Sequence, residues 1–138
     1  MAGYSQTPLL KKLGISEGSR AALLGMPSGL DLELPPHVMV SRQVRGPVDV
    51  VLVFVTKTSQ LNRRFELLAA AIFPVGGLWI AWPKKSSGVQ SDVTDHVIRE
   101  LAIDHGLVDN KVCAIDDTWT AMRVVWRVEN RDKTLDHF

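Results

Sequence analysis

The sequence has little that could cross-link the chain or hold it in a membrane. Cys113 is the single cysteine among 138 residues, so an internal disulfide is impossible, which indicates a reducing compartment, most simply the cytoplasm. The uncharged stretch 67–83 is interrupted by Pro74, Gly76 and Gly77, and it is shorter than the roughly 20 apolar residues that a membrane-spanning helix needs. The start of the sequence also lacks the cationic region and long apolar core of a secretory signal. We therefore expect a cytoplasmic protein without a membrane partner.

An excess of charge of one sign is absent as well. Lysine and arginine together number 16 and aspartate and glutamate 15, which gives a formal net charge of +1. Because nucleic-acid binding usually needs a strongly basic face, we expect no nucleic-acid partner. The sequence predicts no metal site and no bound cofactor, since the four histidines do not have the spacing of metal ligands: His37, His96, His105 and His137.

The residues that could carry acid–base or thiol chemistry favour structural roles. Asp116 and Asp117 are adjacent near a predicted turn, and neighbouring side chains on a strand point to opposite faces, so a turn role is favoured over joint catalysis. Cys113 lies within a predicted strand without a basic neighbour in sequence, which is typical of a buried structural thiol. The sequence therefore assigns no catalytic residue, and it does not decide whether the chain is an enzyme.

What the sequence does contain is an alternation of apolar strands and amphipathic helices. Residues 48–56 are apolar almost without interruption, which is typical of a strand covered on both faces. The pattern predicts a helix at 5–15, strands at 19–25, 37–42, 48–56 and 76–83, helices at 59–73 and 91–106, and a hairpin of strands at 109–117 and 121–129.

This order of elements favours an α/β fold. We predict one Rossmann-like three-layer domain over residues 1–138, with a helical segment at 1–17 and a polar tail at 129–138. The six-stranded sheet is expected to be mostly parallel and to end in a C-terminal antiparallel hairpin.

Several phrases resemble known families. Four phrases resemble parts of a pared-down Rossmann-like methyltransferase domain. The first strand with its loop resembles "GSRAALLGMPSG", and the fourth strand resembles "DVVLVFV". The fifth strand resembles "FPVGGLWIAWPKK", and the final hairpin resembles "GLVDNKVCAIDDTWTAMRVVWR". "YSQTPLLKKLGI", "GGLWIAWPKKSSG" and "VCAIDDTW" are similar to an uncharacterised bacterial family, domain of unknown function 3052. The methyltransferase resemblance implies the strand order 2-1-3-4-6-5.

The sequence also departs from the methyltransferase pattern. Leu24 stands where an acid is expected before Gly25, and residues 41–43 stand where a second acid would bind ribose hydroxyls. The helix expected after the first strand is nearly absent from the pattern. These departures argue against useful binding of S-adenosylmethionine.

Polar residues follow the predicted parallel strands at their carboxyl ends, where ligands bind in such sheets. Lysines, hydroxyls and helix N-termini at one edge favour a small anionic or nucleotide-like ligand, although the same residue types also serve as helix caps. The candidate ligand contacts are Gly25, Ser28, Thr56, Lys57, Lys84, Lys85, Ser86 and Ser87.

Two other functions remain open. One is a methyltransferase-like enzyme that uses S-adenosylmethionine through an atypical cofactor loop. The other is a protein-interaction module, including a homodimer, in which Trp119 and Trp126 at the edge of the hairpin form an exposed contact instead of packing in the core.

Overall fold

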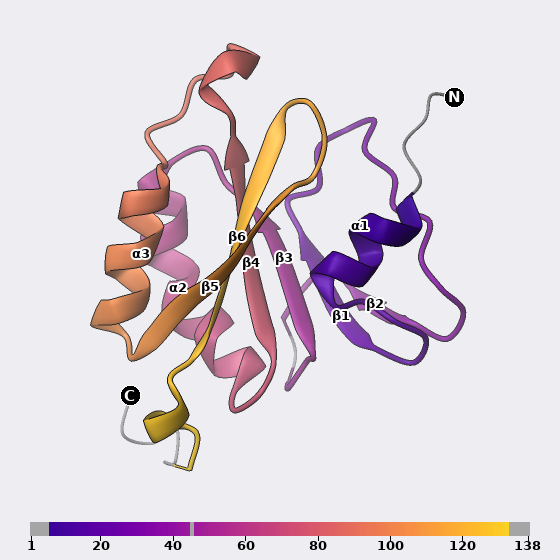
Figure 1. Ribbon diagram of the computed structural model, residues 1–138, viewed down its shortest axis with the longest axis vertical. Helices are drawn as coiled ribbons and strands as arrows, with labels where there is room; N and C mark the ends of the chain where they lie inside the picture. Colours follow the sequence, from indigo (N-terminus) through magenta and orange to yellow (C-terminus); the bar gives the residue numbers. More distant parts are fainter. Residues whose placement is uncertain (1–5, 45, 133–138) are drawn as a thin grey trace.

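The computed structural model describes residues 6–44 and 46–132 (Figure 1). Ser5, the first residue of the predicted helix 5–15, and most of the predicted polar tail lie outside these residues. The elements follow the order α1 (Gln6–Leu13), β1 (Arg20–Leu24), β2 (Met39–Ser41), β3 (Val50–Phe54), α2 (Thr58–Ile72), β4 (Gly77–Pro83), η1 (Lys85–Ser87), α3 (Asp95–Asp104), β5 (Leu107–Ala114), β6 (Trp119–Trp126) and η2 (Val128–Asn130).

The sheet confirms the predicted fold and strand order. Its six strands lie in the order β2-β1-β3-β4-β6-β5. β1 pairs with β2 and β3 in parallel, and β3 pairs with β4 in parallel. β6 pairs antiparallel with both β4 and β5. The C-terminal hairpin therefore extends the parallel sheet, with β6 inside it and β5 at its edge.

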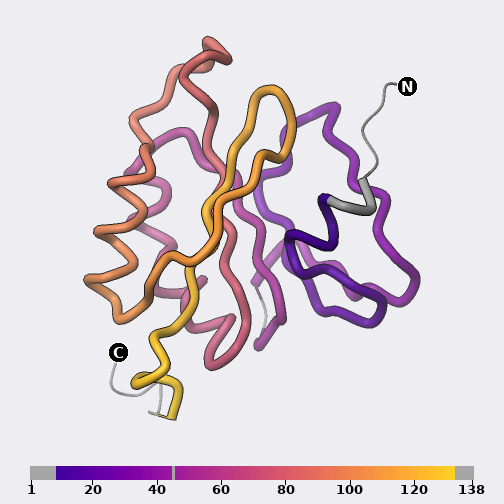
Figure 2. The backbone as a smooth tube through the Cα atoms, viewed as in Figure 1, coloured from indigo at the N-terminus to yellow at the C-terminus, as the bar shows by residue number. Residues whose placement is uncertain are grey.

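The uninterrupted apolar run of β3 reflects burial on both faces of the sheet. Val51 and Val53 point into a core that is covered by α2 and α3. Val50, Leu52 and Phe54 point into a second core, which α1 and the connection between β1 and β2 cover. Figures 1 and 2 show this three-layer arrangement, with α2 and α3 on one side of the sheet and α1 on the other.

Two buried tryptophans join the helices to the sheet. The Trp79 indole Nε1 donates a hydrogen bond to the carbonyl oxygen of Leu13, at the end of α1, over 2.9 Å. The Trp126 Nε1 donates to the carbonyl oxygen of Ala69, in the last turn of α2, over 2.8 Å. Both carbonyls belong to a helix end, where no helical N–H is available to them. Trp126 is only 2% exposed, so it belongs to the core and not to a surface patch on the hairpin.

The structure corrects the bounds of several predicted elements: the hairpin strands lie at Leu107–Ala114 and Trp119–Trp126 instead of 109–117 and 121–129, and β2 and α3 differ as well. Strand β2 is shorter than the predicted 37–42 and begins at Met39, because His37 has a positive φ of 62° and so lies in a turn. The predicted helix 91–106 begins only at Asp95, because Thr94 caps it by accepting a hydrogen bond from the Val97 N–H. Residues 88–94 form an extended connection before it. No described helix is long and apolar enough to span a bilayer.

Candidate ligand-binding crevice

Parallel pairing of β1, β3 and β4 brings the polar segments that follow these strands to one edge of the sheet. Two hollows open there. One, the β1–β2 crevice, has a volume of about 580 Å³ and is lined by residues between Leu23 and Leu34 together with Val40 and Arg42. The other, the β3–β4 hollow, has a volume of about 750 Å³ and lies among Thr56, Lys57, the end of β4 and the connection that leads to α3.

The predicted contact residues divide between these hollows. Gly25 and Ser28 line the β1–β2 crevice, whereas Thr56, Lys57 and Lys85 line the β3–β4 hollow. The other three predicted contacts, Lys84, Ser86 and Ser87, lie outside the residues that line the two hollows. The predicted set is therefore not one site, and its role in binding a ligand stays a prediction.

Lys84 is held by the C-terminal hairpin. Its Nζ donates a hydrogen bond to the carbonyl oxygen of Asp116 over 2.8 Å, and its backbone N–H donates to Thr118. The Ser87 hydroxyl donates to the Lys84 carbonyl oxygen over 2.6 Å. Asp116 itself accepts the N–H groups of Thr118 and Trp119, as the turn role predicted. Through these bonds residues 83–88, the "PKKSSG" segment, join β4 to the hairpin.

The N-terminus of α2 is already occupied by a carboxylate of the chain. The Thr58 N–H donates to Asp92 Oδ1 over 2.6 Å, and the Thr58 hydroxyl donates to the same oxygen over 3.1 Å. The N–H groups of Thr56 and Lys57 both donate to Gln60 Oε1 over 3.2 Å. Together these side chains satisfy the donors that an external anion would otherwise meet at the start of the helix.

The pKa of Asp92 reflects this position. The hydrogen bond from the Thr58 backbone lowers the pKa of the carboxyl below its ordinary value of 3.8, and the nearby Lys57 ammonium acts in the same direction. Asp92 is therefore ionised at neutral pH and fastens the connection between η1 and α3 to α2. Sequence reasoning missed this contact because the two residues are 34 positions apart and neither belongs to a recognisable motif.

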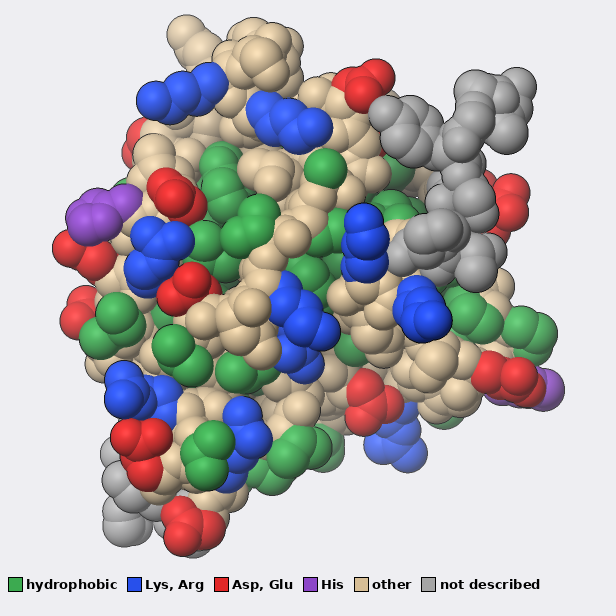
Figure 3. All heavy atoms as spheres, in the orientation of Figure 1, with side chains coloured by type: hydrophobic (Ala, Val, Ile, Leu, Met, Phe, Trp, Pro, Cys, Tyr) green, Lys and Arg blue, Asp and Glu red, His purple; other side chains and the backbone are tan. Residues whose placement is uncertain are grey.

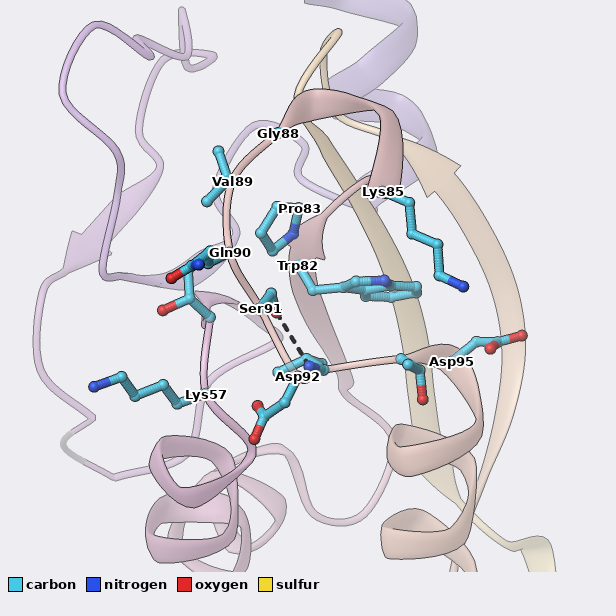
Figure 4. A pocket seen from close by; sticks show the side chains of 13 residues that line it. Lys57, Trp82, Pro83, Lys85, Gly88, Val89, Gln90, Ser91, Asp92 and Asp95 are labelled. Carbon is cyan, nitrogen blue, oxygen red and sulfur yellow. Dashed lines mark hydrogen bonds between the residues drawn. The ribbon is translucent and has the colours of Figure 1, made fainter.

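Charges in the β3–β4 hollow are balanced. Figure 4 shows Lys57 and Asp92 on one side of the hollow and Lys85 and Asp95 on the other, with the half-buried ring of Trp82 between them. Two lysines and two carboxylates thus line this hollow, and the predicted anion contact there stays a prediction. Among the described residues there is also no group of three or more side chains that could hold a metal ion.

The β1–β2 crevice has a different chemistry. Its lining mixes apolar side chains, among them Met26, Leu30 and Val40, with one charge of each sign, Asp31 and Arg42. Gly25 has a φ of +69°, and a Cβ at this position would lie 2.9 Å from the carbonyl oxygen of Phe54. Glycine is thus required where the loop leaves β1 close against β3. No helix follows β1 within residues 25–38, in agreement with the sequence pattern.

Several solved structures with similar folds are methyltransferases. An S-adenosylmethionine-dependent methyltransferase from Aquifex aeolicus superposes with a TM-score of 0.60 at 14% identity, covering 88% of this chain and 89% of its own. Magnesium protoporphyrin IX methyltransferase from Synechocystis PCC 6803, solved with bound SAH, gives 0.56 at 9% identity, covering 88% and 80%. A putative methyltransferase from Thermoplasma acidophilum gives 0.54 at 10% identity, covering 93% and 77%.

The chain has a methyltransferase-like Rossmann fold. At these identities the likeness shows the fold alone. No family model and no curated protein sequence matches the chain, so the resemblance to the domain of unknown function 3052 family has no support from those comparisons.

Proposed function

We propose that the chain is a methyltransferase-like domain that binds an adenosine-containing ligand, first of all S-adenosylmethionine or SAH, in the β1–β2 crevice. The observation that carries this proposal is the position of the crevice. It opens at the carboxyl end of β1, beside the point between β1 and β3 where the strand order reverses, which is where ligands bind in such sheets. Its volume of about 580 Å³ suits a base and a ribose, and its lining offers both apolar side chains and a few polar groups.

A second candidate ligand is an anionic nucleotide, and Arg42 is the observation that favours it. The end of the second strand holds an acid where ribose hydroxyls are bound, whereas an arginine near that position accommodates a ribose phosphate. Arg42 lines the crevice at this place and is exposed. A change in the charge of Arg42 should therefore affect the binding of S-adenosylmethionine or SAH and the binding of an anionic nucleotide in opposite directions.

Isothermal titration of the wild type, Arg42→Glu and the control Arg63→Glu distinguishes the two candidates. Arg63 is an exposed arginine of α2, so its reversal makes the same change in net charge away from the crevice. We expect Arg42→Glu to strengthen SAH binding roughly tenfold and to weaken ATP binding by a similar factor, because hydrogen bonds to charged groups are worth about 1.5–3 kcal/mol.

Each result of these titrations favours one ligand class or contradicts the proposal. Tighter binding of ATP than of SAH by the wild type would favour the anionic nucleotide. An absence of heat with both ligands at millimolar concentration, or equal responses of the two variants, would contradict the proposal.

The interaction-module alternative has less support. It requires an exposed aromatic patch on the hairpin, but Trp126 is buried and Trp119 packs against Phe54 with their ring centroids 5.1 Å apart. A homodimer stays a prediction.

A further inference from the structure

Basic side chains meet on the face of the hairpin that carries α1, away from both hollows. Lys111 of β5 lies directly opposite Arg123 of β6 in the antiparallel ladder. Paired residues point to the same face of a sheet, and like charges placed directly opposite are destabilising. Arg123 also pairs with Trp79 of β4, and the Trp79 side chain lies in the core that α1 covers. Arg123 and Lys111 therefore point to the face of the sheet on which α1 lies.

Arg123 is half-buried, and its guanidinium lies over the start of β4. A Cβ built on Gly77 would lie 2.9 Å from Arg123 Cζ, so the guanidinium fills the space beside β4 that a side chain at position 77 would take. Burial lowers the pKa of Arg123, and the nearby Arg131 adds to this effect. Within residues 6–44 and 46–132, no carboxylate forms an ion pair with Arg123.

A fourth cation belongs to the same surface. The Lys12 ammonium, at the end of α1, is close enough to Cys113 of β5 to oppose the rise that burial causes in the pKa of the thiol. Cys113 lies on the same face as Arg123, two residues after Lys111. Figure 3 shows basic side chains on this face, between the hairpin and α1. We call Lys12, Lys111, Arg123 and Arg131 the basic face.

Two of the described carboxylates near the hairpin pair with other cations. Asp109 pairs with Arg99 of α3, and Glu129 pairs with Arg127. The whole sequence has a net charge of only +1, so four cations together are a local concentration and not a general property of the molecule.

We propose that the basic face binds the phosphoryl group of a small phosphorylated molecule, at a second site distinct from the β1–β2 crevice. A dianionic phosphoryl group offsets the repulsion between Lys111 and Arg123. It also accepts two parallel hydrogen bonds from a guanidinium, while the ammonium group of Lys111 acts as a point charge beside it. The site adjoins the amino end of β4, whereas the crevice opens at the opposite, carboxyl edge of the sheet.

The test is a titration of the full chain with inorganic phosphate, followed by ¹H–¹⁵N correlation spectra at constant ionic strength with chloride as reference. We use Arg42→Ala as the background, so that the crevice arginine does not compete for phosphate. Amide signals of Lys111, Val112, Arg123 and Val124 should shift and saturate together. Arg123→Gln should weaken the binding roughly tenfold or more, whereas Arg63→Gln, which removes the same charge from α2, should leave it unchanged.

Lys111→Gln provides a second variant, because Lys111 is exposed and its loss leaves the core intact. It should weaken phosphate binding as well. Equal binding by Arg123→Gln and Arg63→Gln, or shifts spread over the surface without saturation, would overturn the proposal. Tighter binding of a short single-stranded oligonucleotide than of phosphate would overturn the assignment to a small molecule. None of these results depends on whether the crevice binds an adenosine-containing ligand.

Discussion

The two hollows at the carboxyl edge of the sheet differ in sequence and in how the chain uses their polar groups. "VVLVFVTKTSQ" and "LWIAWPKKSSG" both place a lysine and small hydroxyls after a buried strand. In the structure these groups bind other parts of the chain: Asp92 and Gln60 cover the start of α2, and Lys84 joins β4 to the hairpin. "GMPSG" borders the other hollow, the β1–β2 crevice, whose lining combines apolar side chains with Asp31 and Arg42.

The comparison shows that the type of residue after a strand does not tell whether its side chain contacts a ligand or caps a helix of the same chain. A helix N-terminus attracts a carboxylate of the chain for the same reason that it attracts a ligand anion. At the β3–β4 hollow internal partners reach those donors, and that depends on tertiary placement.

The largest expected effect concerns the glycine that shapes the crevice. Gly25→Ala should lower the free energy of unfolding by about 3 kcal/mol, because it adds a left-handed backbone penalty to a close contact with Phe54. Gly29→Ala is the matched control: its φ is +85°, yet nothing lies within 4 Å of the added Cβ, so a loss of about 1 kcal/mol is expected. Urea denaturation measures both. Equal losses would show that the contact with Phe54 is not what requires glycine.

A smaller effect on stability is expected at the hydrogen bonds between Asp92 and Thr58 of α2. Asp92→Asn should lower the melting temperature at neutral pH without changing ligand binding in the crevice. The folded-state pKa of Asp92 lies below its unfolded value, so the stabilisation is present above the unfolded pKa and is lost as the pH falls through the folded pKa.

The melting temperatures of the wild type and Asp92→Asn should therefore converge below about pH 4. Asp117→Asn, which neutralises an exposed carboxylate in the hairpin turn, serves as control and should track the wild type. A difference that persists unchanged in acid would contradict the role given to the carboxylate.

Much of the fold could be predicted from the sequence because it depends on burial. The uninterrupted apolar runs of β3 and β4 and the spacing of apolar residues along α2 gave the layers, and the resemblance gave the strand order. Asp92 could not be predicted, since its partner Thr58 is distant in sequence. The basic face could not be predicted either, because the register that sets Lys111 opposite Arg123 includes an irregularity between Asp109 and Lys111.

The smallest effect is expected at the "PKKSSG" segment. Because Lys84 binds Asp116 and Lys85 faces a charge-balanced hollow, Lys84→Ala/Lys85→Ala should keep the whole difference between the sulfate-induced and chloride-induced shifts in melting temperature. Sulfate stabilises proteins generally by exclusion from their surfaces, so the wild type must be measured beside the double variant. Loss of the sulfate-specific shift in the double variant would instead indicate that Lys84 and Lys85 bind anions.

The central claim is that the ligand site is the β1–β2 crevice and not the β3–β4 hollow. A titration of the ¹⁵N-labelled chain with SAH, followed by amide chemical shifts, tests it most directly. The account predicts saturable shifts at Gly25, Ser28, Gly29 and Arg42, with little change at Thr58 and Asp92. Shifts confined to residues 56–58 and 85–95 would place the ligand in the other hollow and contradict the account.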